Sequence, residues 1–221
     1  MKRHHTNRDG FTLIEIVIAV AIVAIFAAAL SPMVFRHLED AKLTKALNET
    51  EVLSTAMLSY YKDTGAWPYT NANGPSGNTI ARLTSSTNVA TGAGSGAGTS
   101  AANWGSYGTT KAIGDYLYFN NPDNDSSATG NRADQNNQDW PIAGTGAWRG
   151  PYVDGYEFND PWGRAYVVNV RYAPGGAYTG TLRHKVFVLS AGPNGTWETP
   201  YSDGAIEEIM GDDIGSVLTI R

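Results

Sequence analysis

The sequence predicts an α+β fold, in which a long N-terminal helix that spans a membrane packs against a small antiparallel β-sheet. Two observations predict it. Residues 11–30 form an apolar run with a single charge at Glu15, and a helical pattern continues beyond the run to Thr64. Segments rich in β-branched and aromatic residues appear only after residue 164. Helical signals followed by strand signals are typical of an α+β domain.

The apolar run has the length of a membrane span. A basic leader, residues 1–10, precedes it, and the run begins at Phe11. Because twenty helical residues cover about 30 Å, the thickness of the hydrocarbon core, we expect residues 11–31 to cross the membrane. The positive-inside rule keeps the basic leader in the cytoplasm and places the rest of the chain on the far side. Glu15 costs about 2.5–3.5 kcal/mol within a membrane, so the sequence predicts a partner for it.

The helix is expected to continue as an amphipathic segment over residues 32–64. Pro32 should kink it, and Gly65 followed by Pro68 should end it. One stripe of this segment is predicted to pack against the head; it contains Leu43, Ala46, Leu47, Thr50, Leu53, Met57, Tyr60 and Tyr61.

The rest of the chain, residues 65–221, is predicted to form a globular head. Residues 71–139 are polar and rich in small side chains, which indicates a loop-rich surface insertion with one short element at 111–118. Two strands are expected, at 165–172 and 182–189.

Composition and motifs exclude several classes of function. The formal net charge is -5, which argues against a head that binds nucleic acid nonspecifically, since such heads need a basic face. The chain has no cysteine, so no disulfide closes the exported head. No nucleophile elbow, phosphate loop or dinucleotide fingerprint is present, and the sequence therefore does not predict an enzyme.

The hexapeptide Gly10-Phe11-Thr12-Leu13-Ile14-Glu15 resembles the class III signal of type IV pilins and type II secretion pseudopilins. The resemblance implies the type IV pilin-like fold. It also implies cleavage between Gly10 and Phe11 by a prepilin peptidase, followed by N-methylation of Phe11. In an assembled filament, Glu15 would pair with the amino group of Phe11 of a neighbouring subunit. The alternative is a plain membrane anchor with a stray glutamate.

Several patches of the head resemble the G-type major pseudopilin of type II secretion. They cover the end of the helix and the C-terminal third, but not the middle of the chain. The absence of cysteine also favours this branch, because many type IV pilins close their C-terminal region with a disulfide. The patches are residues 61–68, 148–152, 160–163, 189–195 and 211–214.

The last two patches frame a calcium loop in that family. The resemblance implies that Asp212 and Asp213 supply carboxylates, Asn194 an amide oxygen, and Leu189 and Ser190 backbone carbonyls; calcium prefers six to eight such oxygens. Asn194 stands where an aspartate is usual, and the stretch between the two patches is longer than usual. The alternative is that Asp212 and Asp213 form an exposed acidic turn.

The resemblance implies a structural subunit of a helical pseudopilus that drives protein export in type II secretion. Its implied partners are further copies of the chain, minor pseudopilins, the prepilin peptidase, an assembly ATPase and a membrane platform; no nucleic acid is expected. The subunit would cross the bacterial inner membrane once, with a periplasmic head, and would join a periplasmic or extracellular filament. The alternatives are a type IV pilin of a surface fibre for adhesion, motility or DNA uptake, and a membrane-tethered binding module or hydrolase.

Overall fold

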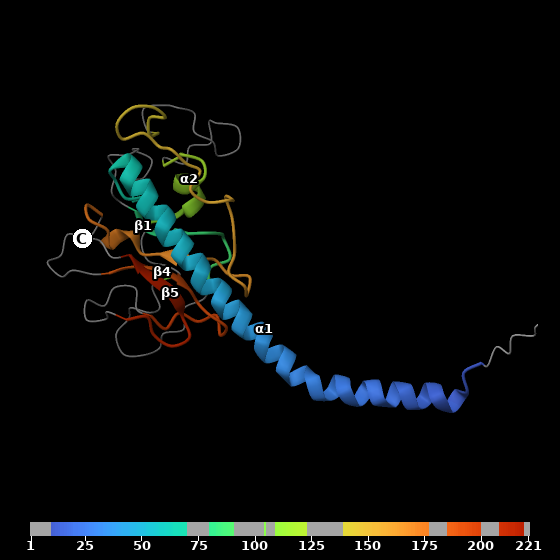
Figure 1. Cartoon of the computed structure of the whole chain (residues 1–221). Helices are drawn as coiled ribbons and strands as arrows, with labels where there is room; N and C mark the ends of the chain where they lie inside the picture. Colours follow the sequence, from blue (N-terminus) through green and yellow to red (C-terminus); the bar gives the residue numbers. More distant parts are fainter. Residues whose placement is uncertain are drawn as a thin grey trace, which may run out of the picture. The chain divides into compact units, whose positions relative to one another are not determined.

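The computed structural model describes residues 10–69, 80–90, 104, 109–122, 139–176, 185–199 and 208–218. The chain divides into two compact units, Met1–Ala41 and Lys42–Arg221. The predicted leader lies outside the described residues except for Gly10. Figure 1 shows the order of the helices and strands along the chain.

Helix α1 runs from Leu13 to Thr64, which confirms the long helix expected from the sequence. It continues through Pro32. It ends where the sequence predicts, because Gly65 adopts a φ of 76° and donates its amide to the carbonyl of Tyr61 at 2.8 Å. In the first unit, the side chains of α1 are exposed, and this segment is apolar and long enough to cross a membrane.

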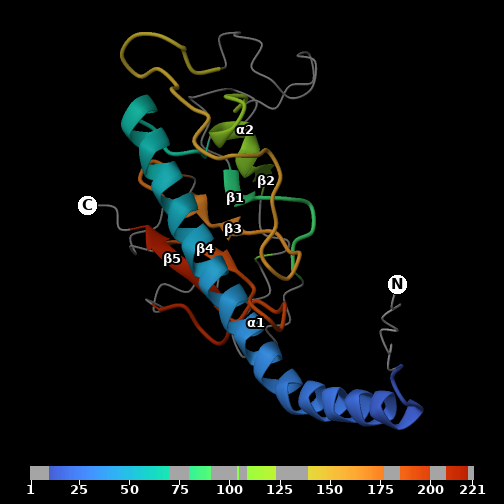
Figure 2. The same ribbon diagram turned by 45° about the vertical axis from the view of Figure 1, so that its right-hand side comes forward.

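The second unit contains a five-stranded sheet in the order β2-β1-β3-β4-β5. Three of its four strand pairings are antiparallel, whereas β1 and β2 are parallel, so the sheet is mixed and the expectation of a purely antiparallel sheet is wrong in this respect. The strands, visible in Figure 2, are β1 (Ile80–Thr84), β2 (Thr109–Ala112), β3 (Val167–Val168), β4 (Val186–Ser190) and β5 (Ile214–Leu218).

The predicted strand at 165–172 is much shorter in the structure. Strand β3 ends at Val168, and the 3-10 helix η2 (Val170–Tyr172) follows. Asn169 makes this change: its φ of -87° and ψ of 63° leave the β region. Its side chain then bonds the backbone on the neighbouring segment, donating to the Lys185 carbonyl at 3.1 Å and accepting from the Phe187 amide at 2.6 Å. Of the second predicted strand, residues 182–184 lie outside the described residues, and β4 begins at Val186.

The segment 71–139 is not simply a surface insertion. Strand β1 lies inside the sheet between β2 and β3, and all five of its residues are buried. Its polar side chains bond within the structure; Arg82, for example, donates to the Thr110 hydroxyl at 2.5 Å. The short element expected at 111–118 is present as the end of β2 and the helix α2 (Ile113–Leu117). The low-complexity part of this segment lies outside the described residues.

The outer half of α1 lies across the sheet (Figures 1 and 2) and packs into the main hydrophobic core. Five members of the predicted stripe are buried, and the last three belong to this core: Ala46, Thr50, Leu53, Met57 and Tyr60. The other three, Leu43, Leu47 and Tyr61, stay 39–43% exposed on its flank.

Polar contacts add to the packing between α1 and the sheet. Tyr166 donates its hydroxyl to Glu49 at 2.5 Å, and Ser216 of β5 donates to the carbonyl of Thr50 at 3.0 Å. These contacts attach the helix to strand β5 and to the residue that precedes β3, which fixes the position of the outer half of α1 within the second unit.

Candidate functional site

Two sites carry the residues singled out in the sequence, and the first is the N-terminus of α1. The Thr12 amide and hydroxyl both donate to Glu15 Oε2, at 2.8 and 2.7 Å. The Glu15 amide approaches the Thr12 hydroxyl oxygen at 3.4 Å. This reciprocal arrangement is a capping box, in which the side chains of the N-cap residue and of the third helical residue bond each other's amides.

The capping box gives Glu15 a local role that the sequence analysis missed. The pattern Thr-x-x-Glu before an apolar run was the available signal. Gly10 and Phe11 lie just outside the box; Phe11 is 86% exposed, and a Cβ added at Gly10 would contact nothing within 4 Å. The structure therefore places the three predicted processing and assembly residues together at an open helix end.

The second site is the C-terminal loop before β5. Asp213 is buried, and its Oδ2 accepts hydrogen bonds from the amides of Glu198 at 3.0 Å and Thr199 at 2.6 Å. Asp212 Oδ2 accepts from the Asn194 amide at 2.9 Å. The Oδ1 atoms of Asp212 and Asp213 are buried, and none of the described residues offers them a hydrogen-bond partner. Unpartnered buried carboxylate oxygens are costly, so they are candidates for a bound cation.

Glu198 joins these two carboxylates, although the sequence analysis did not identify it. Its Oε2 accepts the Asp212 amide at 2.6 Å. Burial raises the pKa of the Asp213 carboxyl to about 6, and the nearby Glu198 carboxylate adds to the rise. Burial also raises the pKa of Asp212, again with a contribution from Glu198. The Glu198 carboxylate thus repels both aspartates in a partly buried loop.

The other predicted calcium ligands already bond protein groups. Asn194 Oδ1 accepts the Thr196 amide at 2.6 Å. Leu189 and Ser190, whose backbone carbonyls were the predicted ligands, lie in β4; Leu189 is paired with β3 and β5, and Ser190 is paired with Ile214 of β5. Among the described residues, no group of three or more His, Cys, Asp or Glu side chains has an arrangement that could hold a metal ion.

Asp160 belongs to patch 160–163 and connects it to patch 189–195, which contains the turn after β4. It is buried, and its Oδ1 accepts the amides of Trp162 at 2.9 Å and Arg164 at 2.8 Å. Arg164 then donates to the carbonyl of Gly192 at 2.8 Å. Residues 160–164 therefore hold the turn that follows β4 in place through these hydrogen bonds.

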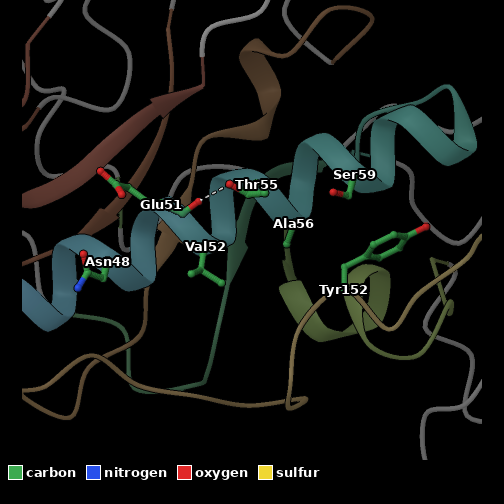
Figure 3. Close-up of a pocket in the computed structure, with 7 residues that line it drawn as sticks. All are labelled: Asn48, Glu51, Val52, Thr55, Ala56, Ser59 and Tyr152. Carbon is green, nitrogen blue, oxygen red and sulfur yellow. Dashed lines mark hydrogen bonds between the residues drawn. The ribbon is translucent and has the colours of Figure 1, made fainter.

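A groove of about 650 Å³ runs along α1 in the second unit (Figure 3). Its lining combines hydroxyl, amide and carboxylate side chains with the apolar side chains of Val52 and Ala56. The lining residues are Asn48, Glu51, Val52, Thr55, Ala56, Ser59 and Tyr152.

Tyr152 forms the far wall of this groove and is held in place. Its hydroxyl donates to Asp63 Oδ2 and accepts the Arg149 amide, each at 2.9 Å. Its ring packs edge-on against Tyr60, with centroids 5.9 Å apart. Burial raises the pKa of Tyr152 to about 12, so the phenol stays protonated and keeps donating to Asp63.

Comparison with known proteins bears on the first site. Residues 5–31 match the prokaryotic N-terminal methylation motif. The chain carries the N-methylation motif of the type IV pilin family. The match includes Gly10, Phe11 and Glu15, the residues that meet at the N-terminus of α1.

Curated relatives include both pilins and a secretion protein. The chain is 36% identical over 85 residues to a fimbrial protein of Neisseria meningitidis, covering 38% of this chain and 46% of that protein. It is 37% identical over 70 residues to the type IV major pilin protein PilE1 of Neisseria gonorrhoeae, covering 32% and 33%. It is 38% identical over 64 residues to the type II secretion system core protein G of Pseudomonas aeruginosa, covering 29% and 45%.

These alignments span less than half the length of each relative. No solved structure matches the chain significantly. The methylation motif, the relatives and the observed α+β architecture are consistent with the pilin-like superfamily.

Proposed function

We propose that the chain is the structural subunit of a helical filament of the type II secretion kind. The observation that carries the proposal is the first unit: an exposed apolar helix whose N-terminus presents Glu15 beside Phe11 within a methylation motif. Exposed apolar surface of this extent needs a covering, first by lipid and then by the helices of other subunits. We assign no catalytic role.

Assembly would use the charge of Glu15. A cleaved chain begins with the Phe11 amine, and the carboxylate of Glu15 in a neighbouring subunit can neutralise it. Both charges would otherwise be buried unpaired among apolar helices. Removing one partner of such a buried pair typically costs about 3–5 kcal/mol.

A surface pilus is the second candidate function, and the relatives named as fimbrial proteins and pilins favour it. Deletion of the gene separates the two. Loss of exported proteins from the medium, with surface fibres unchanged, supports the secretion filament. Loss of surface fibres with normal export supports the pilus and contradicts our first proposal.

We expect the mature protein to begin at Phe11 and to carry a methyl group on its amine. Gly10 precedes the apolar run, so cleavage after it leaves the membrane helix on the protein. Among the described residues, no atom lies within 4 Å of a Cβ built at Gly10. Mass spectrometry of the intact protein from native membranes measures both events. An uncut Met1, or a first residue beyond 20, would contradict the expectation.

We also propose that Asp212 and Asp213 hold a calcium ion, with backbone carbonyls and water as its remaining ligands. Two observations support this proposal. The described residues offer no hydrogen-bond partner to the two buried Oδ1 atoms, and the Glu198 carboxylate raises the pKa of both aspartates. When bound, the ion would neutralise these carboxylates and stabilise the loop before β5, much as a disulfide closes other small exported domains.

Calcium is expected to raise the melting temperature of the full chain in detergent. A hundredfold excess over Kd adds about 2.7 kcal/mol, equivalent to about 5–10 °C for a domain of this size. Asp213→Asn keeps acceptors for the two amides but loses the charge, so it should remove the shift. Asp154→Asn, a change of the same kind on an exposed loop, should retain it. Identical melting in millimolar calcium and in chelator would show that protein contacts alone close the loop.

A further inference from the structure

The apolar surface of the first unit extends beyond residue 31. Met33, Val34 and Phe35 are 59, 62 and 66% exposed, and Arg36 is the first charged residue after Glu15. Residues 16–35 are therefore twenty consecutive uncharged positions. We propose that in the unassembled subunit the hydrocarbon core of the membrane holds residues 16–35, and that Glu15 and the Phe11 amine lie at its cytoplasmic surface. This inference rests on the membrane anchorage contained in the proposed function.

Helix length supports this position. Residues 13–35 of α1 form a helical stretch of about 34 Å, whereas the hydrocarbon core is about 30 Å thick. About three helical residues must therefore lie outside the core or be accommodated by tilt. The surplus equals the length of residues 13–15, the three helical residues up to and including the only charged side chain of the run.

The choice between the two ends is decided by charge. Shifting the span from 11–30 to 16–35 changes the amount of apolar side chain in the core very little. Phe11, Leu13 and Ile14 leave the core, and Met33, Val34 and Phe35 enter it. The shift also releases the Glu15 carboxylate and the Phe11 amine into water, while only the weakly polar Ser31 and Pro32 enter. Charges are far more costly in hydrocarbon than a hydroxyl already bonded to its own helix, as Ser31 is to the Ala27 carbonyl at 2.7 Å.

The helix N-terminus favours the same position. The first four amides of a helix have no carbonyl partner within it, and hydrocarbon offers them none. The capping box serves the amides of Thr12 and Glu15, but those of Leu13 and Ile14 still require water or headgroup oxygens. With the span at 16–35, these amides lie at the aqueous surface.

The far end of the span is equally well marked. Arg36 and His37 follow Phe35 directly, and Glu39 and Asp40 come within the next turn. Long basic side chains at a helix end bury their stems and extend their charged groups to the interface. Glu15 therefore enters an apolar environment only when the subunit leaves the bilayer for the filament, where its pairing with the amine becomes necessary.

The chain has no cysteine, so single-cysteine variants of the full chain can test this position directly. Leu13→Cys and Met33→Cys are a matched pair. Leu13 would lie about three residues outside the core if the span is 16–35, and Met33 about three residues outside it if the span is 11–30. Ile22→Cys reports the centre of the span, and Leu38→Cys the far side. The probe is a charged, membrane-impermeant maleimide. It is applied to inside-out and right-side-out vesicles from cells lacking the assembly ATPase, and detergent-solubilised samples give complete labelling.

We expect Leu13→Cys to react from the cytoplasmic face, Leu38→Cys from the opposite face, and Met33→Cys to be protected. Protection of Leu13→Cys overturns the inference: with Met33→Cys reactive, the span is 11–30, and with both protected, residues 11–35 cross at a tilt. Labelling of Ile22→Cys in intact vesicles would show that the segment does not cross the membrane. That result contradicts the anchorage in the proposed function and is distinct from a wrong position.

Discussion

Glu15→Gln is expected to abolish filament assembly while leaving the amount of protein in the membrane unchanged. Glutamine also completes a capping box, so this variant keeps the contacts with Thr12 and removes only the charge. The Phe11 amine of the neighbouring subunit then stays buried and unpaired, at a cost of about 3–5 kcal/mol for each subunit added. Sheared filaments and membrane fractions, quantified with the same antibody, measure the two quantities.

Two further variants separate charge from capping. Thr12→Ala loses the hydroxyl of the box, which typically costs about 0.5–2 kcal/mol of helix stability, but it keeps the carboxylate and should still form filaments. Glu15→Ala loses both functions and should behave like Glu15→Gln. Filaments of Glu15→Gln at wild-type abundance would mean that the charge is dispensable, and the proposed pairing with Phe11 would be wrong.

Tyr60→Ala is expected to lower the free energy of unfolding of the head by about 3–5 kcal/mol, the usual cost of truncating a buried aromatic residue. Tyr60 is fully buried on α1 and packs edge-on against the rings of Tyr116, Trp140 and Tyr152. Its removal leaves a cavity between the helix and the rest of the head. All six tryptophans lie in the second unit, so tryptophan fluorescence during urea unfolding in detergent follows the head alone.

Tyr60→Phe is the matched control. It keeps the ring but leaves the Trp140 indole N–H, which bonds the Tyr60 hydroxyl at 2.5 Å, without its acceptor. The expected loss is about 1–3 kcal/mol, clearly less than for the alanine variant. If both variants unfold at the same urea concentration, the ring does not carry the packing that the structure assigns to it.

Sequence alone could predict α1 well, because its signals are local. The apolar run and the 3.6-residue period define the helix, and Gly65 with its positive φ ends it. Sequence alone predicts less well which apolar residues of α1 face the core, because this depends on where the sheet covers the helix. Leu43 and Leu47 fit the predicted stripe but lie on its exposed flank, since the sheet covers only the face around Ala46, Leu53 and Met57.

The sheet was predicted less well because its strands depend on distant partners. Strand β1 has the sequence Ile-Ala-Arg-Leu-Thr, whose short alternation of apolar and polar residues is typical of a half-buried strand. All five of its residues are nevertheless buried, because β2 and β3 flank it. Strand β5 contains Gly215, which reads as a break in a strand. A Cβ at that position would lie 2.2 Å from the carbonyl oxygen of Val188, so the close approach of β4 requires glycine there.

The candidate site residues show the same dependence on distance along the sequence. Gly10, Phe11 and Glu15 are close in sequence, so their pattern could be identified directly, and Thr12 could have been added from the capping-box spacing. Glu198 could not have been found in this way. It lies 14 residues before Asp212, and only the folded loop brings its carboxylate to the Asp212 amide.

Electron cryomicroscopy of the assembled filament tests the central claim most directly. The account predicts that the apolar segments of α1 form the filament core, with each Phe11 amine within about 3 Å of a Glu15 carboxylate of a neighbouring subunit. A filament whose Glu15 side chains face solvent, or one held together by its heads with the apolar helices outside the core, would contradict it.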